Sequence, residues 1–322
     1  MASVGAAIVT WNSAPEIGRC LDALLAQGIR EITVVDNASE DATCELVRRR
    51  NVRLIANPWN RGFAAAVNQG VEALEAELVL LLNPDTEVLG GLDALVAACM
   101  RPGVAAAGGK LVDASGRPQR GFMVRRFPMA ATLALEMLGV NRLWPGNPVN
   151  RRYRCLDLDP EQAAEVEQPA GAFLMFRRDV WRELGGFSEV FVPLWFEDVD
   201  FLRRTALAGY RIRYEPRAVA RHLGARSVAK LNWENRQWYW YDNLFRFAAG
   251  HFSPLKYRAL LVMAVVASVV RGAGGMLVHG RAALRAYGRI IRLAAKRLTA
   301  GGRETQGWRS RIVDGGEVPG GC

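Results

Sequence analysis

The chain has 322 residues, half of them hydrophobic, and a formal net charge of +10. This length and composition predict a globular protein with a substantial core and exclude an intrinsically disordered chain. The charge is uneven, because residues 251–322 contain 12 Lys and Arg but only three acids, which leaves residues 1–250 at +1. A nearly neutral body with a basic C-terminal segment favours an anionic partner for that segment alone.

The five cysteines lie far apart in the sequence, and no two of them form a C-x-x-C pair. This pattern excludes a disulfide framework and a zinc–cysteine site, and it predicts reduced thiols. Residues 1–5 contain no basic segment and the apolar run after them is short, so no secretion signal is predicted. We therefore expect a cytoplasmic protein.

Four apolar segments in the first 82 residues alternate with helical patterns. Pro15 lies at the start of the first helical pattern, and Ser39 is the expected N-cap of the second, which runs towards Arg50. This alternation predicts βαβ units and an α/β fold with a mainly parallel sheet flanked by helices. The expected strands are residues 4–10, 32–35, 52–56 and 78–82.

Polar residues stand at the ends of three of these strands. Thr10 ends the first strand, Asp36 follows the second, and Asp85 follows the fourth just after Pro84, which cannot continue a sheet ladder. Because parallel strands end at one edge of a sheet, these side chains are expected to converge where open α/β sheets bind ligands. Taken alone, residues 83–85 are explained better by an ordinary turn.

The sequence lacks the glycine-rich phosphate loops of two common nucleotide-binding families. No G-x-G-x-x-G follows the first strand, and no G-x-x-x-x-G-K-[ST] occurs. A bound nucleotide would therefore be held by carboxylates and a metal.

The pattern is looser beyond residue 108. Residues 117–154 are rich in Arg, Pro and Asn and are expected to form a mobile loop over the site. Residues 168–176 predict a return strand, residues 178–184 a short helix and residues 211–214 a short strand. The aromatic residues of 232–247 are mostly expected to pack in the core.

Three acids stand at the start of a predicted helix that continues to Gly209. Glu197, Asp198 and Asp200 lie in its first turn, where they suit the helix dipole. They also follow bulky aromatic residues, and repulsion among them would raise the pKa of one, as a proton acceptor requires. From these residues alone, capping and catalysis explain the pattern about equally well. His222 stands alone, which is more typical of a structural histidine than of a ligand.

The basic C-terminal segment contains two apolar patterns. Residues 260–270 are too few to span a bilayer, and a longer span would place Arg271 in the membrane. From Arg281 to Arg297, cations alternate with Leu, Ile and Ala at helical spacing, which is typical of a helix lying on an anionic membrane surface. Nucleic acid is the competing anion, but no base-reading motif occurs. We therefore expect peripheral attachment to the inner face of the cell membrane.

Five short motifs occur in order along the chain. They are VTWN at 9–12, VDNAS at 35–39, NRGF at 60–63 with Asn68, LNPDT at 82–86 and FEDVD at 196–200. Each motif is weak alone, but over residues 4–250 their order resembles that of family 2 inverting glycosyltransferases of GT-A fold. Within that family the chain is most similar to bacterial rhamnosyltransferases that use dTDP-L-rhamnose, on residues 83–86, 196–200, 222–227 and 242–254.

The resemblance implies a nucleotide site and a metal site. Thr10 and Asp36 would hold a pyrimidine nucleotide, with Asp36 accepting a hydrogen bond from the N3–H group of the base. Asp85, the last acid of a D-x-D-like motif, would bind Mg²⁺ or Mn²⁺ at the diphosphate with His222, although Asn83 stands where many relatives have the first Asp. Further nucleotide contacts are implied for Asn12, Asn60, Arg61, Asn68 and Asn83.

The resemblance also implies the chemistry. Asp198 matches the general base of the family, while Glu197 and Trp195 would shape the acceptor site. The implied reaction is a metal-assisted single displacement, in which an acceptor hydroxyl loses its proton to Asp198 as it attacks the anomeric carbon. Inversion at a β-L-rhamnosyl donor would give an α-L-rhamnoside. The implied acceptor is a glycan, in particular a lipid-linked one, in cell-wall or surface polysaccharide synthesis.

Alternatives remain open. The donor could be another nucleotide sugar: UDP-GlcNAc, UDP-galactose or GDP-mannose. The nearest rival by fold is a nucleotidyltransferase. Such enzymes, however, usually carry a G-x-G-x-R-type loop where this chain has residues 10–13. A non-catalytic membrane scaffold is a third, and the sequence leaves a homodimer open. We expect a nucleotide-sugar-binding half at 1–110, an acceptor-binding half with the base at 111–250, and a basic helical tail at 251–322 with a disordered end.

Overall fold

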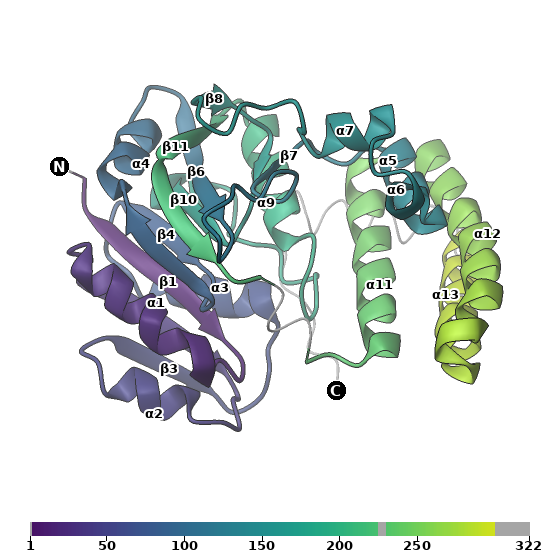
Figure 1. Cartoon of the computed structure of the whole chain (residues 1–322), viewed down its shortest axis with the longest axis horizontal. Coiled ribbons are helices and arrows are strands. Elements are labelled where there is room, and N and C mark those ends of the chain that lie inside the picture. Colours follow the sequence, from purple (N-terminus) through teal and green to yellow (C-terminus); the bar gives the residue numbers. More distant parts are fainter. Residues whose placement is uncertain (1, 225–229, 300–322) are drawn as a thin grey trace. The chain divides into compact units, whose positions relative to one another are not determined.

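The computed structural model describes residues 2–224 and 230–299 (Figure 1). Within these residues the chain forms two compact units. Unit 1 comprises residues 2–127, 154–189 and 197–224, and unit 2 comprises residues 128–153, 190–196 and 230–299. The two units do not coincide with the three consecutive segments expected from the sequence, because each unit is assembled from separate stretches of the chain.

Unit 1 is built on a nine-stranded, mixed sheet with the strand order β3-β2-β1-β4-β10-β6-β11-β5, and β8 pairs with β11. β1 pairs in parallel with β2 and β4, β2 with β3, and β6 with β11, whereas β10 is antiparallel to both β4 and β6. The mainly parallel α/β sheet and the return strand are therefore confirmed. The strands are β1 Val4–Thr10, β2 Glu31–Asn37, β3 Arg53–Asn57, β4 Leu78–Leu82, β5 Thr86–Gly90, β6 Val104–Val112, β8 Ala164–Glu165, β10 Phe173–Arg177 and β11 Arg211–His222, with β7 Val124–Arg125 and β9 Gln168–Pro169 forming a separate pair.

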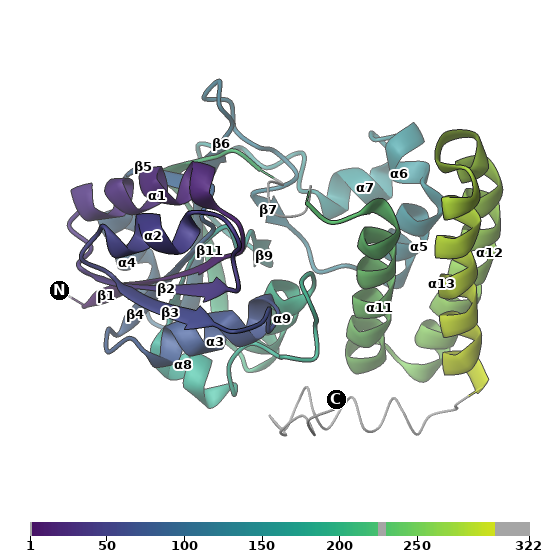
Figure 2. The same cartoon turned by 90° about the horizontal axis from the view of Figure 1, so that it is seen from below.

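The apolar strands of this sheet are covered on both faces. In β4, Leu78, Leu80 and Leu82 pack into the core on one face, while Val79 and Leu81 pack into the core on the other. Successive side chains of a strand point to opposite faces, so a strand that is apolar throughout requires two covering layers. Helices α1, α2 and α4 cover one face and α3, α8 and α9 the other (Figure 2). Their bounds are α1 Ala14–Ala26, α2 Thr43–Arg48, α3 Phe63–Glu72, α4 Leu92–Cys99, α8 Arg178–Glu183 and α9 Glu197–Leu207.

Three expectations about local structure are wrong. Helix α2 begins at Thr43 with Ala42 as its N-cap, so Ser39 does not cap it. Residues 117–154 do not form one long loop, because three helices of unit 2 and strand β7 lie within them. Strand β11 continues to His222, well past the expected end at residue 214, because it pairs along its length with β6 and then with β5.

Unit 2 is helical in its described residues. Helix α12 packs against α5 and α13, and α11 packs against α13. Five residues of α13 are buried within this unit: Ala283, Ala286, Tyr287, Ile290 and Ala294. Leu284 of the same helix is 47% exposed, and attachment of this helix to a membrane surface stays a prediction. The helices are α5 Ala130–Leu138, α6 Val140–Leu143, α7 Pro148–Tyr153, α11 Trp233–His251, α12 Pro254–His279 and α13 Arg281–Thr299.

Polar side chains of α11 hold two other parts of unit 2. Asp242 accepts hydrogen bonds from Arg246 of the same helix and from Arg297 of α13. The amide of Asn243 donates to the carbonyl oxygens of Val192 and Leu194, at 3.1 and 2.8 Å. Helix α11 thereby fixes the backbone of residues 190–196, which lead directly into Glu197.

Some predicted features lie outside the described residues: residues 225–227 of the motif after His222, residues 300–322 of the tail, and Cys322. Four cysteines lie within the described residues and form no disulfide there: Cys20, Cys44, Cys99 and Cys155.

Candidate active site

Thr10 and Asp36 lie side by side at the carboxyl ends of β1 and β2. They are paired in the sheet register, and the Thr10 hydroxyl donates a hydrogen bond of 2.7 Å to Oδ1 of Asp36. Both side chains are buried. The pair therefore lies at the edge of the sheet at which the sequence predicts a nucleotide-binding site.

Asp36 also organises the loop that follows it. Ser39 donates to Asp36 twice, from its hydroxyl to Oδ1 at 2.5 Å and from its backbone N–H to Oδ2 at 2.8 Å. The Ser39 hydroxyl in turn accepts from the backbone N–H of Asn12 at 2.7 Å, and Oδ1 of Asn12 accepts from Glu40. Asn12 and Ala38 both have positive φ, at 52° and 60°, a strained conformation that is typical of ligand-binding loops. A contact of Asp36 with a nucleotide base remains a prediction.

The predicted residues after β3 have different roles in the structure. Asn60 and Arg61 are exposed, and Oδ1 of Asn60 accepts from the backbone N–H of Gly62, at the start of α3. Asn68 instead connects α3 to the backbone of Phe187. Its amide donates to the Phe187 carbonyl at 2.8 Å, and its Oδ1 accepts from the Phe187 N–H at 2.9 Å. We therefore give Asn68 no nucleotide contact in the proposal below.

Asn83 and Asp85 follow β4 at the same edge. The backbone N–H of Asn83 donates to the Ala172 carbonyl at 3.1 Å, which ties this turn to the start of β10. The Asp85 carbonyl accepts from the backbone N–H of Leu223, just past the end of β11, at 3.1 Å. The turn interpretation of residues 83–85 is thus correct for the backbone, since Thr86 N–H donates to the Asn83 carbonyl. The Asp85 side chain remains available for another role.

Asp85 and His222 face each other, with Oδ1 and Nε2 3.5 Å apart and both side chains buried. Nδ1 of His222 lies 3.0 Å from Oε1 of Gln119, whose amide donates to the His222 carbonyl. An amide oxygen only accepts, so Nδ1 carries the proton and Nε2 presents its lone pair to Asp85. Burial lowers the pKa of His222 and favours this neutral form.

This donor set fits a divalent cation of the Mg²⁺ or Mn²⁺ type. A carboxylate oxygen and a neutral imidazole nitrogen point at one another, and the imidazole is oriented by a second hydrogen bond, as metal-binding histidines commonly are. Among the described residues no cluster of three or more His, Cys, Asp or Glu could hold a metal. The remaining ligands would therefore have to come from the substrate and water.

Asp198 lies in the first turn of α9 and is half-buried. Its Oδ1 accepts from the backbone N–H of Val199 at 2.8 Å, and its Oδ2 accepts from the N–H of Gly171 at 3.3 Å. Burial raises the pKa of Asp198, and these two N–H groups and the charge of Arg125 oppose that rise. Each oxygen of this carboxylate keeps a lone pair that accepts no hydrogen bond from these two groups. A half-buried carboxylate with such lone pairs and a raised pKa is suited to accept a proton.

Glu197 is buried beside Asp198, and its Oε2 has no hydrogen-bond partner. Its pKa is raised well above the usual value, first by burial and then by the charges of Asp198 and Asp200. Asp200, in contrast, forms a buried ion pair with Arg204 at 2.9 Å. The three acids thus have separate environments, and only Asp200 is accounted for by the packing of the helix.

The predicted acids lie along one edge of the sheet of unit 1. β2, which ends next to Asp36, adjoins β1, and β1 adjoins β4, which precedes Asp85. β10 begins with Phe173 opposite Leu82 of β4. Gly171 and Ala172, just before β10, contact Asp198 and Asn83 respectively. The hydrogen bonds of β10 thus bring the start of α9 to the strand edge that carries Asp85.

Trp195 and Phe196 belong to unit 2 and precede Glu197 directly. Both have positive φ, at 80° and 74°, which is rare for large residues and marks backbone strain. Phe196 packs on Trp240 and Phe247 of α11. Trp195 is partly exposed, and its predicted contact with an acceptor remains a prediction.

Sequence reasoning missed the residues that orient these side chains. Gln119 is 103 residues from His222 and carries no local signal. Gly171 lies in a segment predicted only as a strand, although its backbone N–H contacts Asp198 and a Cβ there would lie 3.0 Å from Oδ2. A glycine just before a buried strand is the one feature that could have indicated such a close approach.

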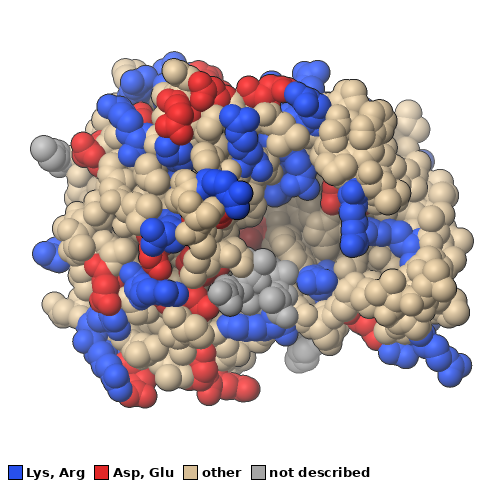
Figure 3. All heavy atoms as spheres, in the orientation of Figure 1, with Lys and Arg blue, Asp and Glu red and all other residues tan. Residues whose placement is uncertain are grey.

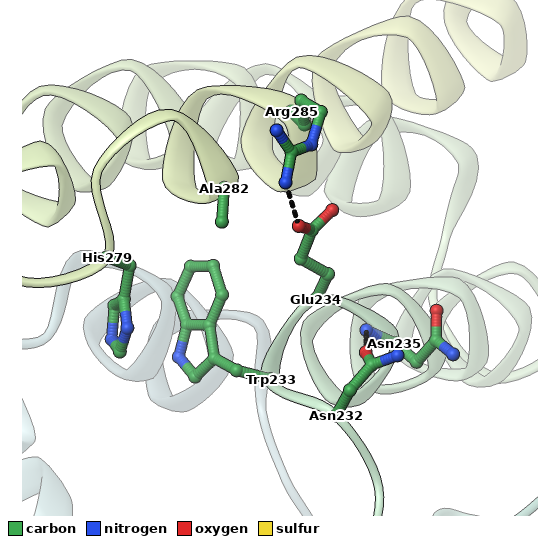
Figure 4. A pocket seen from close by; sticks show the side chains of 7 residues that line it. All are labelled: Asn232, Trp233, Glu234, Asn235, His279, Ala282 and Arg285. Atoms are coloured by element: carbon green, nitrogen blue, oxygen red, sulfur yellow. Dashed lines mark hydrogen bonds and ion pairs between the residues drawn. The ribbon is translucent and has the colours of Figure 1, made fainter.

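Unit 2 contains an open depression of about 520 Å³ at the start of α11 (Figure 4). Trp233 stacks on His279 with ring centroids 4.1 Å apart, and Glu234 pairs with Arg285 at 2.7 Å. None of the predicted site residues lines it. We therefore do not assign the predicted chemistry to this depression.

Two solved structures resemble the chain in fold. They are the mannosyltransferase PcManGT from Pyrobaculum calidifontis in complex with GDP-Man and Mn²⁺ (TM-score 0.51, 19% identity, covering 97% of this chain and 84% of that one) and S. aureus TarS 1-349 in complex with UDP-GlcNAc (TM-score 0.52, 16% identity, covering 97% and 88%). At these identities the likeness concerns the fold alone, which is that of GT-A glycosyltransferases.

Curated proteins match the chain over about two thirds of its length. The O-antigen biosynthesis protein RfbC of Myxococcus xanthus is 28% identical over 217 residues, 64% of this chain and 16% of that protein. The pre-mycofactocin glycosyltransferase of Mycobacterium tuberculosis is 28% identical over 225 residues, 66% of this chain and 40% of that protein. The chain thus spans well under half the length of these relatives. The family model of Glycosyl transferase family 2 matches residues 6–185, more than half of the chain. The chain therefore belongs to glycosyltransferase family 2.

Proposed function

We propose that this protein transfers a sugar from a nucleotide sugar to a hydroxyl group of a glycan, with inversion at the anomeric carbon. One observation carries the proposal: a carboxylate with a raised pKa, Asp198, is held at the sheet edge that also carries the facing pair Asp85 and His222. The first group can remove a proton, and the second can hold the cation of a diphosphate. Inverting transfer needs both of these functions and no covalent nucleophile.

Asp198 acts as the general base in this proposal. Its two oxygens each accept one backbone N–H, from Val199 and Gly171, and each keeps a lone pair for the acceptor hydroxyl. As the hydroxyl oxygen bonds to the anomeric carbon, its proton moves to Asp198, and the bond from that carbon to the diphosphate breaks on the opposite face. Burial makes this carboxylate a stronger base than an exposed aspartate.

Asp85 and His222 hold the cation at the leaving group. A divalent metal bound there supplies Lewis-acid stabilisation of the negative charge that grows on the diphosphate. Gln119 keeps the His222 ring in the tautomer that presents Nε2 to the site. The nucleotide binds in this proposal at the adjoining strand ends and loop, which contain Thr10, Asn12 and Asp36. Further nucleotide contacts are assigned to Asn60, Arg61 and Asn83.

We further propose dTDP-β-L-rhamnose as the donor and an α-L-rhamnoside as the product. The support is the order of the motifs at 83–86, 196–200 and 242–254, which resembles that of rhamnosyltransferases. UDP-GlcNAc and GDP-mannose are the main competitors, since structures of the same fold contain UDP-GlcNAc or GDP-Man with Mn²⁺. We infer Mg²⁺ or Mn²⁺ as the cofactor.

We infer that the acceptor belongs to a cell-wall or surface polysaccharide and is carried on a lipid. Relatives include an O-antigen biosynthesis protein, a poly-β-1,6-N-acetyl-D-glucosamine synthase and the succinoglycan biosynthesis protein ExoO, which supports a place in polysaccharide synthesis. A lipid carrier would suit a protein with a basic C-terminal segment, and it would place the reaction on the cytoplasmic side of the membrane.

A donor-by-acceptor screen tests the proposal. The full chain is incubated with Mn²⁺ or Mg²⁺ and either dTDP-β-L-rhamnose, UDP-GlcNAc, UDP-galactose or GDP-mannose, and the anomeric configuration of the product is determined by NMR. We expect transfer from the dTDP-sugar with inversion. Preferred transfer from a UDP- or GDP-sugar would overturn the donor assignment, and a retained configuration would overturn the mechanism.

Asp198→Asn separates the enzyme from a non-catalytic scaffold. The substitution keeps the shape of the side chain but removes the base, so we expect kcat to fall about 10²- to 10⁴-fold while donor binding persists. Asp93→Asn, on the exposed side of α4, is the matched control and should keep full activity. Equal turnover of the wild-type protein and Asp198→Asn would refute the assigned role.

A further inference from the structure

Helix α12 has two different sides. Its inner side is buried in unit 2 through residues that include Tyr257, Leu261 and Ala264. Its outer side exposes large apolar side chains at helical spacing, each between 48% and 92% exposed: Leu255, Val262, Val266, Val269, Val270 and Leu277. The helix is long and apolar enough to cross a bilayer by length and composition alone, but its packed inner side is that of a helix in a folded unit.

The outer side of α12 is an apolar surface along the whole helix. At a rise of 1.5 Å per residue, its 26 residues extend over roughly 39 Å. In Figure 3 the right-hand edge of the molecule, where Figure 1 shows α12, is mostly free of charged side chains. Continuous apolar surfaces of this size are uncommon on soluble proteins and mark an interaction site.

Arg271 does not interrupt this surface. It lies on the inner side of the helix, beside the buried hydroxyl of Tyr241, where its charge opposes the rise in the pKa of Tyr241 caused by burial. Arg271, which argued against a membrane-spanning segment in the sequence, is therefore turned into unit 2.

The charges around the surface favour one kind of partner. Lys256 and Arg258 are exposed at one end of α12, and Arg281 is exposed just past the other end. The chain contains no Asp or Glu between residues 251 and 299. Two copies of α12 placed face to face would bring the cations at its ends together, whereas an anionic lipid surface would attract them.

We propose that α12 binds an anionic membrane, lying flat in the interface with Val262, Val266 and Val269 directed into the lipid. The cations at its two ends then lie at the level of the headgroups, and α13 stays packed behind α12. This binding surface is independent of the sugar-transfer site, since none of the residues proposed for transfer belongs to α12.

Vesicle co-sedimentation tests the apolar part of the surface. The full chain, without donor or acceptor, is mixed with phosphatidylglycerol/phosphatidylethanolamine vesicles or with neutral phosphatidylcholine vesicles. The test variant is Val262→Asp combined with Val269→Asp. We expect the wild-type protein to bind the anionic vesicles and the variant to bind them at least tenfold more weakly.

Two controls make the loss interpretable. Leu207→Asp changes a residue of unit 1 that is 73% exposed, and it should leave vesicle binding unchanged. Thermal unfolding of each variant establishes that unit 2 is folded. Undiminished binding by the Val262 and Val269 variant would overturn the proposal, as would equal loss by Leu207→Asp.

The role of the cations is tested by charge-matched pairs. Lys256→Gln with Arg258→Gln should weaken binding to the anionic vesicles severalfold and reduce its salt dependence. Arg48→Gln with Arg49→Gln, both exposed at the C-terminal end of α2, removes the same charge elsewhere and should not weaken binding. Binding that is equal on anionic and neutral vesicles would contradict the electrostatic part of the proposal.

Light scattering without lipid tests the alternative occupant. If the protein is a dimer in solution and the Val262 and Val269 variant is a monomer, the surface is a self-interface and the lipid proposal is overturned. We expect a state of association that the variant does not change. Sugar transfer to a soluble acceptor is measured in parallel, so failure of membrane binding and failure of the proposed activity are told apart.

Discussion

The backbone N–H of Gly171 donates to Oδ2 of Asp198 at 3.3 Å, and this contact joins the segment before β10 to the first turn of α9. A Cβ built at Gly171 would lie 3.0 Å from Oδ2 and 3.2 Å from Cβ of Asp198. The residue at position 171 therefore determines where the carboxylate can lie.

Gly171→Ala should displace the carboxylate of Asp198 and lower kcat. Misplacement of a catalytic group by about 1 Å costs about 10²-fold in rate, so we expect a loss of roughly 10- to 100-fold, with the KM for the donor nearly unchanged. Gly288→Ala is the control, because a Cβ at this helical glycine meets nothing within 4 Å. Steady-state kinetics of both variants check this, and full activity of Gly171→Ala would show that the carboxylate is not held there.

The pH dependence of kcat/KM should report the titration of Asp198. A base must be deprotonated to act, and burial raises the pKa of Asp198, so the rate should fall with decreasing pH already above the usual range of an aspartate. The charge of Arg125 opposes this rise. Arg125→Gln should therefore move the acid limb to higher pH, whereas Arg126→Gln, whose partner is Glu167, should not. An unmoved acid limb in Arg125→Gln would contradict the assignment.

Glu197→Gln should stabilise the protein at neutral and alkaline pH. The pKa of Glu197 in the folded protein is raised, first by burial and then by the charge of Asp198, so the folded state loses stability as pH rises through that pKa. Gln carries no charge, so the gain over the wild-type protein should be largest at pH 8 and shrink as the pH is lowered. Each kcal/mol gained in the free energy of unfolding should raise Tm by about 2–4 °C for a domain of this size.

Thermal unfolding at a series of pH values measures this effect. Glu45→Gln, on the exposed surface of α2, is the control and should unfold like the wild-type protein at every pH. A Glu197→Gln variant that is less stable than the wild-type protein at pH 8 would mean that the buried carboxylate has a partner that compensates for its burial.

Gln119→Ala should weaken metal binding without touching a metal ligand. The Oε1 of Gln119 orients His222 through Nδ1, and loss of such a partner typically costs 10- to 100-fold in metal affinity. We expect the Mn²⁺ concentration for half-maximal activity to rise by that factor while the maximal rate is largely kept. Gln162→Ala, on the exposed surface, is the control. An unchanged Mn²⁺ requirement would remove His222 from the metal site.

Asp242→Asn should destabilise unit 2. Asp242 is nearly buried and accepts from both Arg246 and Arg297, so the substitution removes a carboxylate that forms ion pairs with two cations, at an expected cost of about 3–5 kcal/mol. Asp22→Asn breaks an exposed pair with Arg50 and should cost less than about 1 kcal/mol. Urea unfolding measures both changes, and similar losses in the two variants would show that the Asp242 cluster contributes no more than a surface ion pair.

Local sequence patterns were sufficient for the first four strands of the sheet of unit 1, but not for β5, β6 and β8. The apolar segments of β1, β2 and β4 alternate with helical patterns, and because neighbouring parallel strands end at one edge, Thr10, Asp36 and Asp85 could be placed together without coordinates. The start of α9 and its acids were also predicted from local signals. The helices between residues 130 and 153 were missed, because Arg, Pro and Asn in that region masked a short apolar periodicity.

Only the tertiary structure decided how the site is held and which apolar surface is free. Gly171 and Asp198, or Gln119 and His222, are brought together by strand pairing across large gaps in sequence, and no local pattern encodes such contacts. The same holds for the C-terminal helices. The composition of α13 indicates an amphipathic helix, but whether its apolar side meets lipid or protein depends on what packs against it, and α12 and α11 do. Periodicity establishes that a side chain lies on the apolar side of a helix, whereas its partner is established only when the whole chain has folded.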